Sequence, residues 1–471
     1  MAEALRLFGT PHLDRIGPML RRIDLTTTLG AEPTAGLGSG LGTAALRSVL
    51  PRAAGSAAHA ADEAVAPILA DVRARGAAAV LDYCERFDHV RPESLRVPNS
   101  VIDEAAASLD PALKDALTES IRRARAGHTA QLPTEQRIEL APGGVVTQRW
   151  VPVRRVGLYV PGGLALYPSS VVMNVVPAQV AGVEDIVVTS PPQVSAGGWP
   201  DATVLAACAL LGVSEVYAAG GAQAIALLGY GSEYDAARGL PAVEPVDVIT
   251  GPGNVYVTAA KRALRGIVGI DSEAGPTEIA VIADDSADPR YVAADLISQA
   301  EHDPNAASVL ITSSATLADA VDALLPGMVA ATRHSERVRA ALTGPQSGTV
   351  IVASLDDAVT VADAYAAEHL EVQTRGAAEV ARRIRNAGAV FVGPYSPVSL
   401  GDYCAGSNHV LPTSGGARYS SALNTTTFLK SVQVVEYTAA ALAEVAGPIG
   451  ALTAAENLPA HGEAVAIRLE P

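Results

Sequence analysis

From position 156 onward, short apolar, β-branched runs alternate with helical segments, and this alternation limits the folds open to the chain. Continuous apolar strands separated by helices are typical of parallel sheets that helices cover on both faces. Two sets of runs therefore predict two α/β units. The first set comprises 156–160, 186–189, 216–218 and 246–250, and the second comprises 279–283, 309–312, 350–353 and 390–392.

Composition excludes several classes of protein. The 471 residues are enough for two domains with cores of their own. No run of eighteen apolar residues is free of a Pro, Gly-Gly or charge break, and no basic stretch followed by an apolar block opens the chain, so we expect neither a membrane span nor a secretory signal. Three distant cysteines, Cys84, Cys208 and Cys404, indicate a reducing cytoplasm, and a net charge of -16 disfavours nucleic acid as a partner.

The stretch 401–413 places Asp402 and His409 in a loop that glycines brace and Pro412 closes. Loops of this kind bury little apolar area, which leaves polar side chains free to meet a ligand. The alternative is a surface turn, because Asp, Asn and Gly are the usual turn residues. Other segments decide between the two interpretations.

A second polar group closes a predicted helix. Asp288 and Pro289 are typical of an N-cap and a first-turn proline, and Pro304 ends the segment. Along this helix an apolar stripe changes into Gln299 and then His302, and the spacing of three residues lets both reach one ion. The alternative is a frayed helix end in water. A buried amide and imidazole would each need a partner.

Two further pairs join the set. Glu368 and His369 stand at a predicted helix-to-strand junction, and together they supply what acid–base chemistry near neutral pH requires. Glu456 and His461 lie close to the C-terminus, where a polar tail is the alternative interpretation.

The combination predicts a metal site. Gln299, His302, Asp402 and His461 offer two imidazoles, one carboxylate and one amide oxygen. This set without thiolates suits zinc, with manganese or cobalt as further possibilities, and it is typical of catalytic sites.

With these residues in view, the chain resembles the histidinol dehydrogenase family from about residue 65 to 468. Besides the four candidate ligand segments, the resemblance rests on 157–163, 219–226, 251–257 and 274–278. Thr277 stands where the family often has serine, which preserves a hydroxyl.

The resemblance implies an enzyme that oxidises histidinol to histidine with one Zn²⁺ per subunit and two NAD. His369 would be the base and Glu368 would activate water. The implied NAD contacts are Tyr159, Gln223 and Asn254, each just after a predicted strand. The implied substrate contacts are Ser169, Thr277, Gln299, His302, His369, Asp402, His409, Glu456 and His461.

The resemblance also implies a domain plan of two doubly wound, Rossmann-like parallel-sheet domains with small terminal satellites. One domain would span 156–278 and contact NAD, and a discontinuous one would combine 50–155 with 279–395. The satellites would be 1–49 and 396–471. The C-terminal tail would cross to a second subunit, so that Glu456 and His461 complete the other chain's site in a homodimer.

Two other functions compete. A dehydrogenase of the same fold could act on another polar alcohol with zinc and NAD, but it would not need His409 and Glu456. A metal-binding protein without catalysis would not need the pair Glu368 and His369.

Overall fold

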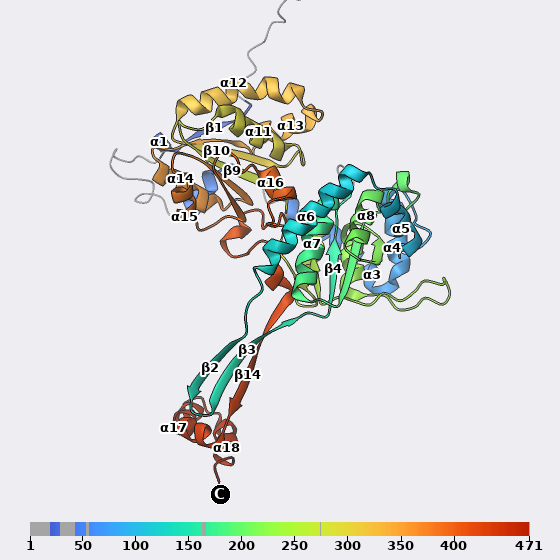
Figure 1. The fold of residues 1–471 in the computed structure, drawn as a ribbon, viewed down its shortest axis with the longest axis vertical. Coiled ribbons are helices and arrows are strands. Elements are labelled where there is room, and N and C mark those ends of the chain that lie inside the picture. The colour runs from blue at the N-terminus through green and yellow to red at the C-terminus, as the bar shows by residue number, and fades with distance from the viewer. Residues whose placement is uncertain (1–18, 29–42, 53–55, 163–165, 274, 471) are drawn as a thin grey trace, which may run out of the picture.

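The computed structural model describes residues 19–28, 43–52, 56–162, 166–273 and 275–470. Much of the expected N-terminal satellite, 1–49, lies outside the described residues. Two parallel sheets organise the rest of the chain, and a third, antiparallel sheet extends away from them (Figure 1). The predicted α/β class with two doubly wound domains is confirmed.

The first parallel sheet has five strands in the order β6-β5-β4-β7-β8. Its core strands bury both faces, as the apolar runs predict, so helices cover each side. The strands are β4 (Arg155–Tyr159), β5 (Asp185–Ser190), β6 (Glu215–Ala218), β7 (Val248–Thr250) and β8 (Gly269–Ile270). One layer contains α7 (Pro168–Ala181) and α8 (Ala202–Leu210), and the other contains α9 (Gly221–Tyr230) and α10 (Val255–Leu264).

The helices before this sheet belong to the same body. They are α3 (Ser56–Arg75), α4 (Ala77–Tyr83), the π-helix η2 (Cys84–Asp88), α5 (Asn99–Ala107) and α6 (Pro111–Thr129). α3 packs on α9 and α10, α5 packs on α8, and α6 packs on α7. The expectation that 50–155 joins 279–395 is therefore wrong, because the apolar faces of these helices complete the two layers over the five-stranded sheet.

The second parallel sheet has six strands in the order β1-β11-β10-β9-β12-β13. The strands are β1 (Arg22–Asp24), β9 (Glu278–Ala283), β10 (Ala307–Thr312), β11 (Gly348–Ile351), β12 (His369–Gln373) and β13 (Ala389–Val392). One layer contains α11 (Pro289–Ala300), α12 (Ala315–Ala331) and α13 (Ser335–Thr343), and the other contains α2 (Thr43–Val49), α14 (Leu355–Tyr365) and α15 (Ala377–Arg383) (Figure 1). A strand from the expected N-terminal satellite thus adds to the edge of this sheet.

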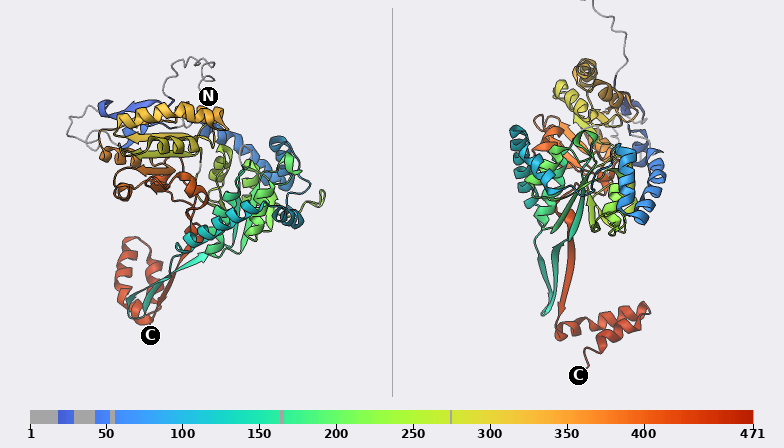
Figure 2. Two further views of the ribbon diagram at one scale, coloured as in Figure 1. Left: turned by 45° about the horizontal axis from the view of Figure 1, so that its top comes forward. Right: turned by 90° about the vertical axis from the view of Figure 1, so that its right-hand side faces the viewer.

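The antiparallel sheet forms a long arm. It consists of β14 (Leu429–Tyr437), β3 (Gly144–Pro152) and β2 (Gln136–Ala141), and its far end carries α17 (Ala439–Ala455) and α18 (Pro459–Ala466). Both further views show the arm standing away from the two bodies (Figure 2). Apolar side chains along it are exposed, including Ile138, Leu140 and Val435. A thin sheet whose faces are exposed to solvent is marginally stable by itself. Among the described residues of a single chain, these apolar side chains of the arm have no surface to pack against.

Short elements complete the described chain: α1 (Leu25–Thr28), α16 (Val398–Tyr403) and the 3-10 turns η3 (Val194–Ala196), η4 (Gly416–Arg418) and η5 (Thr425–Phe428). Within the described residues, no helix is long and apolar enough to cross a membrane.

Candidate active site

The candidate site lies at the amino ends of two neighbouring strands of the six-stranded sheet. Glu278 begins β9 and His369 begins β12, and these strands pair in parallel. α11 runs back along the sheet and ends at this edge, which places Gln299 in its last turn and His302 just beyond it. As predicted, Asp288 caps the start of α11, where its side chain accepts a hydrogen bond from the Arg290 N–H.

A chain of hydrogen bonds holds the Glu368 carboxyl. Gln299 Nε2 donates to Thr277 Oγ1 at 2.5 Å, and that hydroxyl donates to Glu368 Oε2 at 2.5 Å. The backbone N–H of Glu278 donates to the same oxygen at 2.8 Å. Glu368 is buried, and burial raises the pKa of its carboxyl to about 8, with the charge of Asp402 adding to the rise. The site therefore contains a carboxyl poised to change charge close to neutral pH.

One ring nitrogen of His369 makes a hydrogen bond, and the other has no partner among the described residues. Nδ1 lies 3.2 Å from the carbonyl oxygen of Glu278, which can only accept, so Nδ1 carries the proton. Nε2 is buried and has no hydrogen-bond partner among the described residues. Burial lowers the pKa of this imidazole, so the ring is neutral and Nε2 offers a lone pair. This is the state that a general base requires.

Asp402 and His409 approach this pair from α16 and the loop after it. Burial lowers the pKa of His302 and of His409, while the charge of Asp402 acts on both rings and opposes the shift. His409 Nδ1 donates to the Asp402 carbonyl at 3.0 Å, so the loop folds back on its own helix. The structure thus brings Glu368, His369 and His302 together with Asp402 and His409.

The other ring nitrogen of His409, Nε2, contacts the body that contains the five-stranded sheet. It accepts a hydrogen bond from Ser170 Oγ, 3.1 Å away, on α7. Ser169, an expected substrate contact, is buried in the first turn of α7, and the next residue, Ser170, is the one that contacts His409. The site consequently lies where the two bodies meet, beside α16 (Figure 1).

The residues present fit a metal ion, but the described residues of one chain do not supply a full set of ligands. Gln299 Oε1 is buried without a hydrogen-bond partner in the described part of the chain, next to His302 and Asp402. No group of three or more His, Cys, Asp or Glu in that part is arranged to hold a metal. An amide oxygen, an imidazole and a carboxylate therefore leave room for one more ligand.

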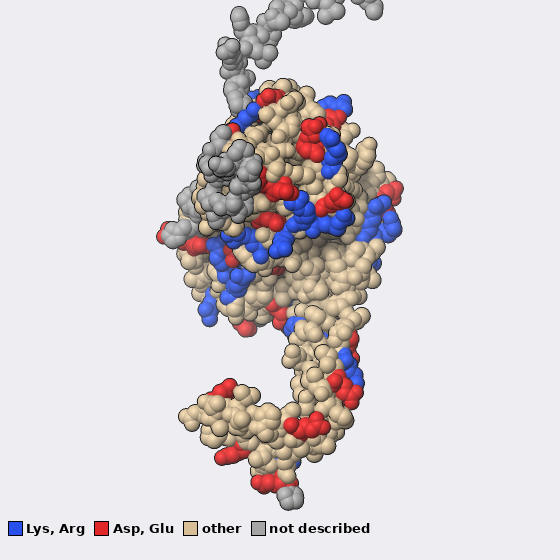
Figure 3. Space-filling view, turned by 90° about the vertical axis from the view of Figure 1, so that its left-hand side faces the viewer, with Lys and Arg blue, Asp and Glu red and all other residues tan. Residues whose placement is uncertain are grey.

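The structure does not bring His461 and Glu456 to these residues within one chain. Both side chains are exposed, His461 in α18 and Glu456 at the C-cap of α17, at the far end of the arm. Figure 3 shows an open space between this end of the arm and the body.

The three expected NAD contacts follow strands β4, β6 and β7 at the carboxyl edge of the five-stranded sheet. Tyr159 ends β4, and its hydroxyl accepts a hydrogen bond from the Gly221 N–H at 3.1 Å. Gln223 is buried in the first turn of α9, and Asn254 caps α10. The strand order reverses between β4 and β7, which is where doubly wound sheets bind nucleotides.

A buried ion pair braces the turn before Asn254. Lys261 Nζ donates to the Gly251 carbonyl at 3.0 Å and also pairs with Asp271, whose other oxygen accepts from the Gly251 N–H at 2.8 Å. Gly251 has a φ of 117°, and a Cβ there would lie 2.0 Å from the Tyr159 carbonyl oxygen. Only glycine fits this position.

Sequence reasoning missed Glu278, although its backbone binds both members of the acid–base pair. Its own carboxyl is buried and lies 3.6 Å from Arg52, and burial raises its pKa to about 7. A charged residue opening an otherwise apolar strand was the available signal.

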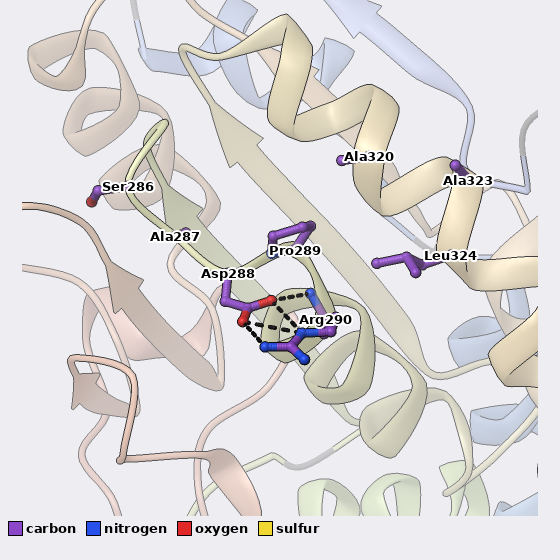
Figure 4. Close-up of a pocket in the computed structure, with 8 residues that line it drawn as sticks. All are labelled: Ser286, Ala287, Asp288, Pro289, Arg290, Ala320, Ala323 and Leu324. Carbon is purple, nitrogen blue, oxygen red and sulfur yellow. Dashed lines mark hydrogen bonds and ion pairs between the residues drawn. The ribbon is translucent and has the colours of Figure 1, made fainter.

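A hollow of about 730 Å³ lies at the opposite end of α11 (Figure 4). It is lined on one side by Asp288 and Arg290, which pair at 2.5 Å, and on the other by Ala320, Ala323 and Leu324 of α12. It is therefore separate from the cluster around Glu368.

The fold and the site together define an α/β protein with a buried carboxyl and imidazole side by side, and candidate metal ligands near them, between two parallel-sheet bodies. A family model described as histidinol dehydrogenase matches residues 51–469. The histidinol dehydrogenase of Nocardia farcinica is 62% identical over 429 residues, covering 91% of this chain and 95% of that protein. That of Mycobacterium tuberculosis is 60% identical over 454 residues, covering 96% and 99%.

A solved structure agrees with these relatives. The crystal structure of histidinol dehydrogenase from Elizabethkingia anophelis superposes with a TM-score of 0.84 at 29% identity, covering 96% of this chain and 98% of that one. The chain belongs to the histidinol dehydrogenase family of oxidoreductases.

Proposed function

We propose that this chain oxidises L-histidinol to L-histidine through L-histidinal, with zinc and two NAD, as the last step of histidine biosynthesis. The observation that carries the proposal is the pair of buried, unpartnered acceptors, Gln299 Oε1 and His369 Nε2, in one cluster of the described chain. An unsatisfied buried acceptor is costly unless a ligand completes it. Membership of the family supports this choice of substrate.

Gln299, His302 and Asp402 would hold the zinc together with His461 of the partner subunit. Bound there, the ion would serve as a template that fixes the substrate's imidazole and amine. Thr277 orients Gln299 for this task, because the Gln299 amide N–H donates to it and leaves Oε1 as the free donor atom for the metal.

Two residues move protons in the two oxidations. His369 Nε2 would take the hydroxyl proton in the first oxidation. Glu368 would take a proton from water as its oxygen adds to the intermediate aldehyde in the second. NAD, when bound, would supply the hydride acceptor for each oxidation. His409, Glu456 of the partner subunit, Thr277 and Ser169 would contact the substrate, and Ser170 holds the His409 ring in place.

NAD would bind across the carboxyl edge of the five-stranded sheet, with Tyr159, Gln223 and Asn254 as contacts. The N-terminus of α9 and that of α10 point to this edge, where backbone N–H groups favour phosphate. NAD supplies the hydride acceptor, and the residues orient it.

A homodimer with shared sites explains the arm. Its exposed apolar side chains need a surface to cover them, and the distant His461 and Glu456 need a site to complete. A second copy of the chain satisfies both requirements by symmetry.

Activity with histidinol tests the proposal. We expect two NADH per histidinol consumed.

We expect a chelator to abolish activity while the circular dichroism spectrum stays unchanged. The reason is that the two parallel sheets have hydrophobic cores that do not depend on the metal. His302→Ala should lose zinc and activity together. Full activity in verified metal-free protein would contradict the metal site, and NADH from other amino alcohols but not from histidinol would favour the alternative substrate.

Glu368→Gln should slow the oxidation of histidinal more than that of histidinol, because the amide cannot take a proton from water. Since the Glu368 pKa is raised to about 8, the carboxylate fraction grows as pH rises, so the wild-type aldehyde step should speed up between pH 6 and 9. A bound cation would move the midpoint below about 8. Separate assays of the two half-reactions across this range check the assignment, and equal losses in both would remove it.

A further inference from the structure

Two carboxyl side chains, Asp295 and Glu371, lie together behind the candidate site. Glu371 is buried in β12, two residues after His369, and Asp295 lies in α11, one turn before Gln299. Gln373 Nε2 donates to both, at 2.9 Å to Glu371 Oε2 and 3.0 Å to Asp295 Oδ2. The pair therefore joins the helix that carries two candidate ligands to the strand that carries the candidate base.

The same pair reaches a third element. Glu371 Oε1 accepts a hydrogen bond from the Val398 N–H at 3.0 Å, and Val398 is the first residue of α16, which carries Asp402. α16 has only six residues, too few to be stable by itself. Its N-cap is Pro397, whose side chain cannot accept a hydrogen bond, and Glu371 satisfies one of the free N–H groups of the first turn, that of Val398.

The two carboxyls also bind each other. Burial raises the pKa of both, and each acts on the other through a side-chain hydrogen bond. A hydrogen bond between two carboxyls needs a proton on one of them, and burial disfavours two charges side by side. The hydrogen bond between Asp295 and Glu371 links α11 directly to β12. Neither carboxyl needs a catalytic role to account for this contact.

We propose that Glu371, braced by Asp295, is a positioning residue that sets Asp402 of α16 against Gln299 and His302 of α11. The inference rests on the proposed zinc site. Glu371 touches neither substrate nor metal; it acts through the N-terminal turn of α16. The distance between ligands on two separate elements depends on this link, and metal affinity falls when ligands are held loosely.

Two substitutions remove the link in different ways. Glu371→Leu deletes the acceptor at similar size. Val398→Pro deletes the donor N–H and retains a slightly smaller apolar side chain at this buried position, and proline is favoured at the first position of a helix. The preceding residue, Pro397, already has the extended backbone that a following proline requires, with φ -68° and ψ 156°. Glu371→Gln preserves the link to α16, because its amide oxygen can still accept from the Val398 N–H. Its NH2 group would take the place of the oxygen that accepts from Gln373 Nε2, and the Gln373 amide can turn so that its unpartnered Oε1 accepts instead.

Zinc affinity is the measured quantity, obtained by titrating metal-free full-length protein against a competing chromophoric chelator. We expect Glu371→Leu and Val398→Pro each to bind zinc about tenfold more weakly or worse, which is the usual effect of losing a residue that supports a ligand. Glu371→Gln should bind as the wild type does. The exposed Glu379→Leu, on the same body, controls for the loss of one carboxylate.

The outcomes separate the two proposals. A wild-type protein that binds no zinc contradicts the proposed metal site, whatever the variants do. Normal zinc binding in both Glu371→Leu and Val398→Pro, with a wild-type protein that binds zinc, overturns the positioning role alone. If Glu371→Leu fails to fold, the zinc affinity of Val398→Pro still tests the positioning role of Glu371. A lowered melting temperature without any change in zinc affinity would likewise count against positioning.

Discussion

His369→Asn is expected to slow the oxidation of histidinol by about 10²–10⁴-fold, the loss typical of a missing general base. Asparagine fits the space and can still donate to the Glu278 carbonyl, as His369 Nδ1 does at 3.2 Å. It has no basic nitrogen in place of Nε2, so kcat should fall far more than substrate affinity.

The pH dependence should agree in sign. Burial lowers the His369 pKa, so the ring stays neutral as pH falls from 8 to 7 and gains a proton only below its ordinary value of about 6.5. We expect the first half-reaction to lose rate only in that acidic range, and the decline should be absent in His369→Asn. Stopped-flow NADH formation measures this step. The exposed His89→Asn, at a left-handed position that suits asparagine, is the control, and equal losses in the two variants would exclude His369 as the base.

The second large effect concerns the shared site. His461→Ala and His302→Ala should each be inactive as homodimers, since each removes one candidate ligand from every site. Mixed by refolding or co-expression, they should recover about a quarter of wild-type activity, because random pairing makes half of the dimers mixed and each of these has one intact site of two. The physical reason is the arm, which holds α18, the helix that contains His461, far from α11, just beyond which His302 lies (Figure 1).

A matched mixture controls this experiment. His302→Ala and Asp402→Ala alter ligands that one chain contributes together, so no mixed dimer should have an intact site. Rescue in the first mixture but not in the second would establish the exchange of arms. Failure of both, in dimers shown to be mixed, would mean that His461 does not complete the partner's site.

The periodicity of apolar residues in the sequence predicted most of the strands of the two parallel sheets. The run predicted at 156–160 is strand β4, and the run at 279–283 lies within β9, because a strand buried on both faces must be apolar along its whole length. The N-cap Asp288 was also predictable, since its side chain acts on a neighbour in the sequence. Residue types likewise singled out Glu368 and His369, whose side chains lie 3.5 Å apart; their acid–base role stays a prediction.

The packing of the early helices was not predictable in the same way. An amphipathic helix reveals that it needs a partner but not which sheet provides it, so α3 to α6 were assigned to the wrong body. The contact between Ser170 and His409 was not predictable for a similar reason, because the rotation of α7 decides which of its side chains face the loop.

Local sequence determined the elements, their caps and the kinds of chemistry available, since each depends on residues a few positions apart. Tertiary structure alone decided that the site forms at the amino ends of β9 and β12, whereas the rule for parallel sheets favours the carboxyl ends. It also decided that the backbone of Glu278 binds both Glu368 and His369. These contacts join residues about ninety positions apart, and only the pairing of the two strands brings them within hydrogen-bond distance.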